Sequence, residues 1–329
     1  MDHTRKGLLF AGSENAVSFS MDDGENWQSL RLNMPATSIR DLVIKDDDLV
    51  VATHGRSFWI LDNITPLRQL TTELIKSNTI LYKPQDSYRV RWCMYPDTPL
   101  PQEEPAGQNP PDGALIDYYL SSKASLVKLE IINDKGNVIR TYTSQDTMYK
   151  IPDVNIPHYW IRPQQILPND AGVHRFSWDM RYAPLDVPAS YPISAIYKNT
   201  APNTTSPFVM PGKYTVRLTV DGKQQSQTCT IKMDPRVKTN MKDLALQHDI
   251  SLMCYSNAKK CMDGLKEIGA KKDSASATFA KEFSTYQSTF MHLQSYLQES
   301  DMSPTKQMIA DAKKAEKDFE ARWLAWKNR

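Results

Sequence analysis

Cysteine is scarce in this chain, and its spacing excludes a disulfide framework. The 329 residues include four cysteines: Cys93, Cys229, Cys254 and Cys261. Disulfide-held scaffolds carry more cysteines in a much shorter chain. Cys254 and Cys261 fall on one apolar stripe of an expected helix, about 10 Å apart along its axis, which is too far for a bridge. These two are expected to be buried thiols, and a pairing of Cys93 with Cys229 stays open.

An excess of charge of one sign and long apolar runs are also absent. With 40 basic and 38 acidic residues the net charge is +2, which gives no electrostatic case for nucleic acid or a membrane surface. No apolar run approaches the ~20 residues of a membrane span. Residues 1–7 lack the apolar core of a signal peptide, so we expect a cytoplasmic protein or a piece of a longer one. No cluster of histidine and cysteine indicates a metal site, and no cofactor is expected.

The first 70 residues are rich in short β-like runs separated by polar turns. Five strands are expected, over residues 7–12, 16–20, 39–44, 48–52 and 56–61. Successive antiparallel strands of this kind form a meander, the unit of a propeller blade. The segment supplies about one and a half four-stranded blades, and a propeller needs at least about four blades to close. It is therefore expected to be a partial β-propeller.

The next two regions differ in proline content. Residues 71–113 contain a run of prolines and are predicted to be a connector. Residues 114–237 predict a β-sandwich, with strands over 114–120, 125–133, 137–142, 172–178, 212–220 and 224–232. Two proline-rich insertions, at 143–168 and 183–211, are expected to be ordered loops on its surface.

From residue 238 to 329 the apolar period changes to about 3.6, which indicates helices. Three apolar stripes can bury one another, so an antiparallel three-helix bundle is expected. Asn240 with Asp243 predicts the start of the first helix, and Ser303 followed by Pro304 predicts the start of the third. The predicted fold class is therefore mainly β with a C-terminal α region.

The stretch from Ser20 to Trp27 is the most informative part of the sequence. Its spacing is Ser20-x-Asp22-x-Gly24-x-x-Trp27, between two expected strands. Gly24 supplies the positive φ that a tight turn needs. Ser20 and Asp22 have short polar side chains that accept hydrogen bonds from a turn's own backbone. The pattern predicts a turn over which the Trp27 ring folds.

This turn matches the Asp-box, or BNR repeat, of β-propellers such as sialidases and sortilin-like proteins. Three further stretches follow in order, at residues 48–62, 109–120 and 210–216. Together they resemble the C-terminal third of large bacterial BNR-repeat proteins that are often labelled glycosyl hydrolases. The resemblance implies partial propeller blades, an immunoglobulin-like sandwich of the flagellar hook-capping type, and then helices.

The same resemblance implies a role and a place. In those families the Asp-box is a structural clasp, usually remote from the catalytic face, so Ser20, Asp22, Gly24 and Trp27 are predicted to be structural. The missing blades imply a fragment, a split gene product or a truncated relative. Relatives of this architecture are commonly exported, to the periplasm or outside the cell. The implied partner is a propeller-containing polypeptide or a carbohydrate.

No catalytic residue is assigned. A glycosidase needs two carboxylates about 5–9.5 Å apart, and a sialidase-like site needs several converging arginines. The candidates are better explained as turn residues or show no informative spacing; they are Asp22, Asp23, Asp46, Asp47, Asp48, Asp62, Arg31, Arg40, Arg56 and Arg68. The six histidines form no Ser/His/Asp or Cys/His arrangement.

The sharpest local candidate for ligand binding is the turn of His54, Arg56 and Trp59. A histidine and an arginine beside aromatic rings suit an acidic or sugar ligand. The alternative is a tight hairpin turn with Gly55 at positive φ.

The predicted function is a non-catalytic structural or interaction region of an Asp-box propeller protein. The first alternative is a fragment of a glycoside hydrolase whose active site lies in missing N-terminal blades. The second is a carbohydrate-binding module that uses aromatics of the sandwich, although core packing explains most of them; they are Tyr118, Tyr119, Tyr159, Trp160, Trp178 and Tyr182.

Overall fold

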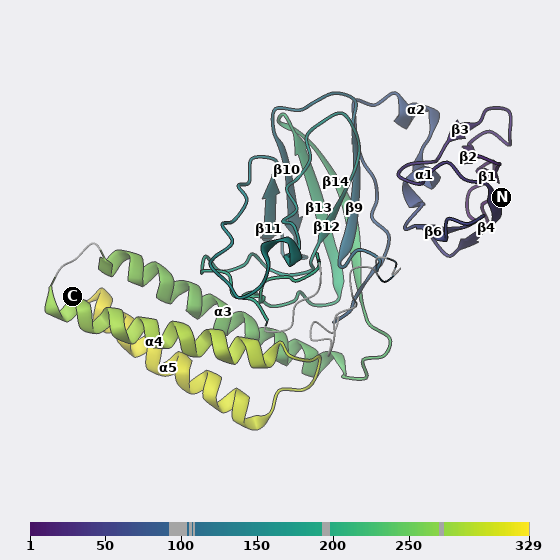
Figure 1. Ribbon diagram of the computed structural model, residues 1–329. Coiled ribbons are helices and arrows are strands. Elements are labelled where there is room, and N and C mark those ends of the chain that lie inside the picture. The colour runs from purple at the N-terminus through teal and green to yellow at the C-terminus, as the bar shows by residue number, and fades with distance from the viewer. Residues whose placement is uncertain (92–103, 105–106, 108, 193–197, 270–272, 329) are drawn as a thin grey trace.

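The computed structural model describes residues 1–91, 104, 107, 109–192, 198–269 and 273–328. The chain is mixed: its described residues are mainly β up to the end of β14, and long helices follow at its C-terminal end (Figure 1). The strands are β1 (Leu9–Gly12), β2 (Val17–Ser20), β3 (Gln28–Ser29), β4 (Ile39–Lys45), β5 (Asp48–Thr53), β6 (Phe58–Leu61), β7 (Thr79–Leu81), β8 (Ser87–Arg89), β9 (Ala114–Leu120), β10 (Val127–Ile132), β11 (Val138–Thr143), β12 (Gly172–Trp178), β13 (Gly212–Val220) and β14 (Lys223–Met233). The helices are α1 (Thr65–Gln69), α2 (Thr72–Ile75), a 3-10 turn (His158–Trp160), α3 (Met241–Gly269), α4 (Ser274–Leu297) and α5 (Lys306–Lys327).

The N-terminal part consists of two small antiparallel sheets with the orders β1-β2-β3 and β4-β5-β6. Each sheet is a meander, because its strands are neighbours in both sequence and space. The sheets share a small core made of Val17, Met34, Leu49, Val51 and Ile64. At Gly12 the edge strand β1 is closely covered by β4, since a Cβ there would lie 2.5 Å from Ile39 Cγ2. Only glycine fits at this crossing.

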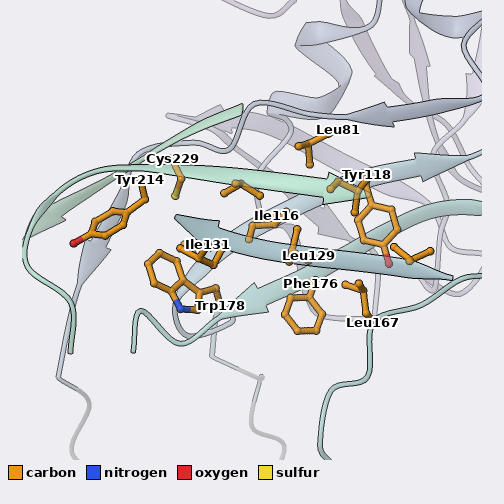
Figure 2. Close-up of a cluster of buried hydrophobic side chains, with 14 of the residues drawn as sticks. Leu81, Ile116, Tyr118, Leu129, Ile131, Leu167, Phe176, Trp178, Tyr214 and Cys229 are labelled. Atoms are coloured by element: carbon orange, nitrogen blue, oxygen red, sulfur yellow. The ribbon is translucent and has the colours of Figure 1, made fainter. Parts of the chain in front are cut away.

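The central part consists of two sheets around one core. Their strand orders are β11-β10-β13-β14-β8 and β12-β9-β7. Side chains from both sheets meet in the interior, where the rings of Trp178 and Tyr214 lie 5.5 Å apart (Figure 2). The rings of Tyr142 and Phe176 lie 4.6 Å apart. At one edge, Gln225 of β14 bonds the backbone of β7, so the sheets curl toward each other.

The strands β7 and β8 differ from the sequence prediction, which placed residues 71–113 in a connector. β7 pairs with β9, and β8 pairs with β14 in parallel. Both strands precede the proline run, so their backbone N–H groups are free to enter the sheets. Pro110 and Pro111 lie outside regular structure, whereas Cys93 and the prolines from Pro96 to Pro105 lie outside the described residues. The proposed Cys93–Cys229 pair is therefore not described, and Cys229 itself is buried in the core.

The three long helices form a bundle in which α4 runs antiparallel to its neighbours. Gln247, near the start of α3, donates hydrogen bonds to the carbonyls of Leu297 and Ser300 at the end of α4, both at 2.6 Å. Arg322, near the end of α5, pairs with Glu282 near the start of α4. The bundle core includes Cys254 and Cys261, as predicted, and aromatic rings such as Phe283, Phe290 and Phe319.

One helix start was predicted wrongly. The first residue of α5 is Lys306, and its N-cap is Thr305, whose hydroxyl accepts a bond from the Met308 N–H at 3.1 Å. The predicted cap, Ser303 with Pro304, lies just before it, because the Thr305 hydroxyl satisfies the orphan N–H instead. The predicted cap of α3 is confirmed, since Asn240 Oδ1 accepts a bond from the Asp243 N–H at 2.9 Å.

Hydrogen bonds between Asn63 and the Arg175–Asp117 ion pair join the N-terminal part to the central sheets. Arg175 of β12 donates from Nε to Asp117 Oδ1 of β9 at 2.8 Å, and from Nη2 to the carbonyl of Asn63 at 3.0 Å. Asn63 in turn donates to Asp117 Oδ2 at 3.1 Å. This arrangement fixes the chain where β6 leads into α1.

A second polar cluster joins the central sheets to the helices. Three arginines surround the Phe208 ring, with Cζ of Arg181, Arg91 and Arg89 at 3.5, 4.8 and 5.6 Å from its centroid. Asp301, in the loop after α4, accepts from both Arg89 and Arg91. Burial and the two neighbouring arginines lower the pKa of Arg181 to about 9.

Candidate functional site

The predicted Asp-box turn connects β2 to β3 and is held by its own side chains. Ser20 is buried, and its Oγ accepts a hydrogen bond from the Gly24 N–H at 2.9 Å and donates to Asp22 Oδ1 at 2.8 Å. Asp22 also accepts from the backbone N–H and the side-chain amide of Asn26, at 2.9 and 2.7 Å. The two polar side chains thus accept hydrogen bonds from backbone N–H groups of the turn, in place of the strand-to-strand hydrogen bonds that longer strands would make.

Trp27 closes the turn from the other side. Its indole N–H donates to the carbonyl of Gly24 at 2.9 Å. A Cβ built on Gly24 would lie 3.6 Å from the indole ring, and Gly24 has φ +98°. Asp23 is also left-handed, with φ +60°. A backbone with two successive left-handed residues therefore sits beneath the ring.

The carboxylate of Asp22 is held in its charged form. Its pKa is lowered from 3.8 to about 2, first because the Asn26 side chain and N–H donate to it and then because Ser20 does. Such a group is a poor proton donor at neutral pH. It suits a hydrogen-bond acceptor that holds a turn, and it does not suit a general acid.

The candidate ligand-binding turn of His54, Arg56 and Trp59 connects β5 to β6. The Thr53 hydroxyl accepts from the Arg56 N–H at 3.2 Å and donates to the Ser57 carbonyl at 2.6 Å. The Trp59 indole N–H donates to the Arg56 carbonyl at 2.8 Å. His54 and Arg56 have exposed side chains at the tip of the turn, and Trp59 is half-buried below it.

These two turns have the same construction, which was not predicted from the sequence. In each, a hydroxyl at the end of the second strand accepts a backbone N–H of the turn, at Ser20 and at Thr53. In each, a tryptophan indole donates to a carbonyl three residues earlier. We call this arrangement the hydroxyl–tryptophan clasp. The shared signal in the sequence is a Ser or Thr followed six or seven residues later by Trp, with a glycine between them.

Trp59 also borders a small apolar hollow between the two N-terminal sheets. The hollow has a volume of about 60 Å³, and its lining includes Leu49, Val51 and Leu61. This volume holds a few water molecules and is too small for a sugar ring. A larger open hollow of about 570 Å³ lies where α3 begins, beside Asp301 and Met302, and none of the predicted site residues lines it.

The candidate carboxylates that make a hydrogen bond or an ion pair use it to hold the N-terminal structure together. Asp47, together with Asp2, pairs with Arg68. Asp48 accepts from the Asn63 N–H at 2.8 Å. The pKa of Asp62 is raised by its burial and by the nearby charge of Asp48. These roles are those of turns and junctions.

The predicted aromatics of the central part are divided between core and surface. Tyr118 and Trp178 are fully buried, and Tyr182 contacts His248 on α3 at 3.3 Å through its hydroxyl. Tyr159 is 62% exposed. The fully buried rings are unavailable for stacking on a sugar.

Among the described residues, no group of three or more His, Cys, Asp and Glu side chains is placed to hold a metal ion. Within the same part of the chain, no helix is long and apolar enough to cross a membrane.

No known protein-family model matches this chain, and neither a curated protein nor a solved structure shows significant similarity to it.

Two groups of residues with a structural or surface role were not predicted from the sequence. The junction residues Asp117, Arg175, Arg89 and Asp301 lie far apart in the sequence, so no local pattern links them. The apolar outer surface of β4, β5 and β6 did leave a signal. Residues 42–44 and 49–51 are apolar at every position, which is typical of a strand covered on both faces.

Proposed function

We propose that this chain is a non-catalytic structural and interaction region of an Asp-box β-repeat protein. The observation that carries the proposal is the pair of N-terminal meanders, both closed by a hydroxyl–tryptophan clasp and packed on a common core. Repeats of this kind bury their apolar faces only by stacking on neighbours. Two units cannot close a ring, because a propeller has at least about four blades.

The finer fold assignment belongs to the same proposal. We interpret the two meanders as parts of propeller blades, and the two central sheets as an immunoglobulin-like sandwich of hook-capping type. The antiparallel sheets around one core support the second interpretation. The parallel pairing of β8 with β14 and the curl at β7 are departures from a simple antiparallel sandwich.

The proposed role is to support or complete a propeller. Polar contacts at both junctions favour such a role. Arg175 and Asp117 of the central sheets bind Asn63 of the N-terminal part, and the buried Arg89–Asp301 pair holds the central sheets to the helices. The carboxylates of the Asp-box turn and of the junctions make internal bonds, which leaves them unsuited to the paired arrangement that glycoside hydrolysis needs.

The test uses a purified sortilin-type Asp-box propeller shortened by its last two repeats. Adding the full chain is expected to raise the unfolding temperature of the shortened propeller in a saturable way, because a ligand that binds only the folded state stabilises it. The intact propeller is the control and should not respond. Hydrolysis of fluorogenic glycosides, or retention on a glycan array with no effect on the propeller, would contradict the proposal.

A further inference from the structure

The sheet of β4, β5 and β6 has two apolar faces. On the inner face, Leu42, Val51 and Trp59 lie in register and pack on the shared core. Because side chains alternate along a strand, the next residues point to the opposite side. There, Val43 pairs with Val50, which pairs with Ile60, and this row crosses all three strands.

A second outer row lies beside the first, where Ala52 pairs with Phe58. We call the five residues Val43, Val50, Ala52, Phe58 and Ile60 the outer face. A meander that is solvated on one side normally carries polar residues on that side. Here the flanking strands expose 52% of Val43, 57% of Ile60 and 77% of Phe58. Contiguous exposed apolar surface of this kind marks an interaction site.

The ends of the outer face are polar. Along β4 the outward positions are Asp41, Val43 and Lys45, so an acidic and a basic residue flank the apolar centre. An apolar centre with a charged rim is the anatomy of a protein–protein interface. The rim also argues against a membrane surface, which favours clustered positive charge.

The occupant is indicated by what already covers the inner face. The meander β1-β2-β3 contributes Val17 and Phe10 to that core. It is closed by the same clasp as β4-β5-β6, so the two sheets are units of one kind. A unit with two apolar faces stacks between neighbours on both sides, and the outer face lacks its neighbour among the described residues.

We infer that the outer face is the docking surface for a three-stranded antiparallel unit of the Asp-box type carried by a partner polypeptide. This inference rests on the proposed function and adds the surface through which the partner binds.

The experiment measures binding of the full chain to the shortened Asp-box propeller by biolayer interferometry. Val43→Asp and Ile60→Asp place a charge in the centre of the outer face. Val173→Asp is the matched control, because Val173 is also a strand valine, 65% exposed, on β12 of the central sheets. Each substitution is on an exposed side chain, and circular dichroism checks that each variant folds.

The wild-type chain and Val173→Asp are expected to bind equally. Each outer-face variant should bind at least about tenfold more weakly, as for truncation of a central interface residue. A photo-crosslinking amino acid at position 60 should join the apolar face of the propeller's terminal sheet, and the same amino acid at position 173 should not.

Equal binding by all variants would overturn the docking surface and leave the proposed function standing. Absence of binding by the wild-type chain would overturn both. A dimer of the chain alone in sedimentation that Ile60→Asp abolishes would show that a second copy covers the outer face, and would also overturn the inference.

Discussion

Arg89 and Asp301 are 212 positions apart in the sequence, yet Arg89 Nη2 donates a 2.7 Å hydrogen bond to Asp301 Oδ1. Both side chains are only 3% exposed. The pair joins β8 of the central sheets to the loop between α4 and α5. Because Asp301 also accepts from Arg91 at 2.9 Å, one carboxylate balances two guanidinium groups.

Asp301→Asn is therefore expected to destabilise the protein by about 3–5 kcal/mol, since it leaves buried arginines without a counter-charge. Urea unfolding measures the loss. Asp186→Asn serves as the control, because Asp186 and its partner Lys266 are both exposed, and it should cost less than about 1 kcal/mol. Equal effects of the two substitutions would show that the buried pair adds nothing.

Asp22→Asn is expected to destabilise the turn between β2 and β3 in a pH-dependent way. The folded-state pKa of Asp22 is about 2 and its ordinary value is 3.8, so its stabilisation is complete above 3.8 and is lost as the pH falls toward 2. The stability difference between wild type and variant should therefore be constant from pH 7 to 5 and shrink below pH 4. Asp23→Asn, at the neighbouring exposed position where asparagine tolerates the left-handed backbone, is the matched control.

Gly264→Ala should destabilise the helical bundle although alanine is the better helix former. A Cβ at this position would lie 2.7 Å from Phe283 Cε2 and 2.9 Å from Trp323 Cζ3. Overpacking of this kind costs about 1–3 kcal/mol, which outweighs a gain of about 1 kcal/mol in helix propensity. Gly269→Ala, in the same helix with open space around the Cβ, should be neutral or stabilising in thermal unfolding.

Stability should also decrease in mildly acidic solution because of His248. Burial against Tyr182 lowers the pKa of His248 below 6.5, although the nearby carboxylate of Asp249 opposes the shift. The unfolded chain then binds more protons, so stability is complete above pH 6.5 and decreases as the pH falls through that value. Urea midpoints at pH 7.5, 6.5 and 5.5 measure the slope. His248→Gln should flatten it, and an unchanged slope would assign the effect to other groups.

Much of the fold could be predicted because many strands are long and alternate clearly. The strands at 114–120, 172–178 and 212–220 have the predicted bounds. β7 and β8 were missed because each has three residues, too few for a period, and β8 is a strand only through its partner β14. The bonds of the turn at Ser20 were predictable because all of them are local. The junctions at Asp117 and Asp301 depend on tertiary contacts that no local pattern encodes.

The parallel pairing of β8 with β14 affects the order of folding. Arg89 and its strand partner Met233 are 144 positions apart, whereas the two N-terminal meanders need contacts only within about the first 64 residues. During synthesis, β7 and β8 therefore stay unpaired until their partner strands β9 and β14 have left the ribosome. Long-range pairing slows folding and leaves strand edges open to wrong partners. We therefore expect the central sheets to form more slowly than the small N-terminal sheets, whose pairing is local.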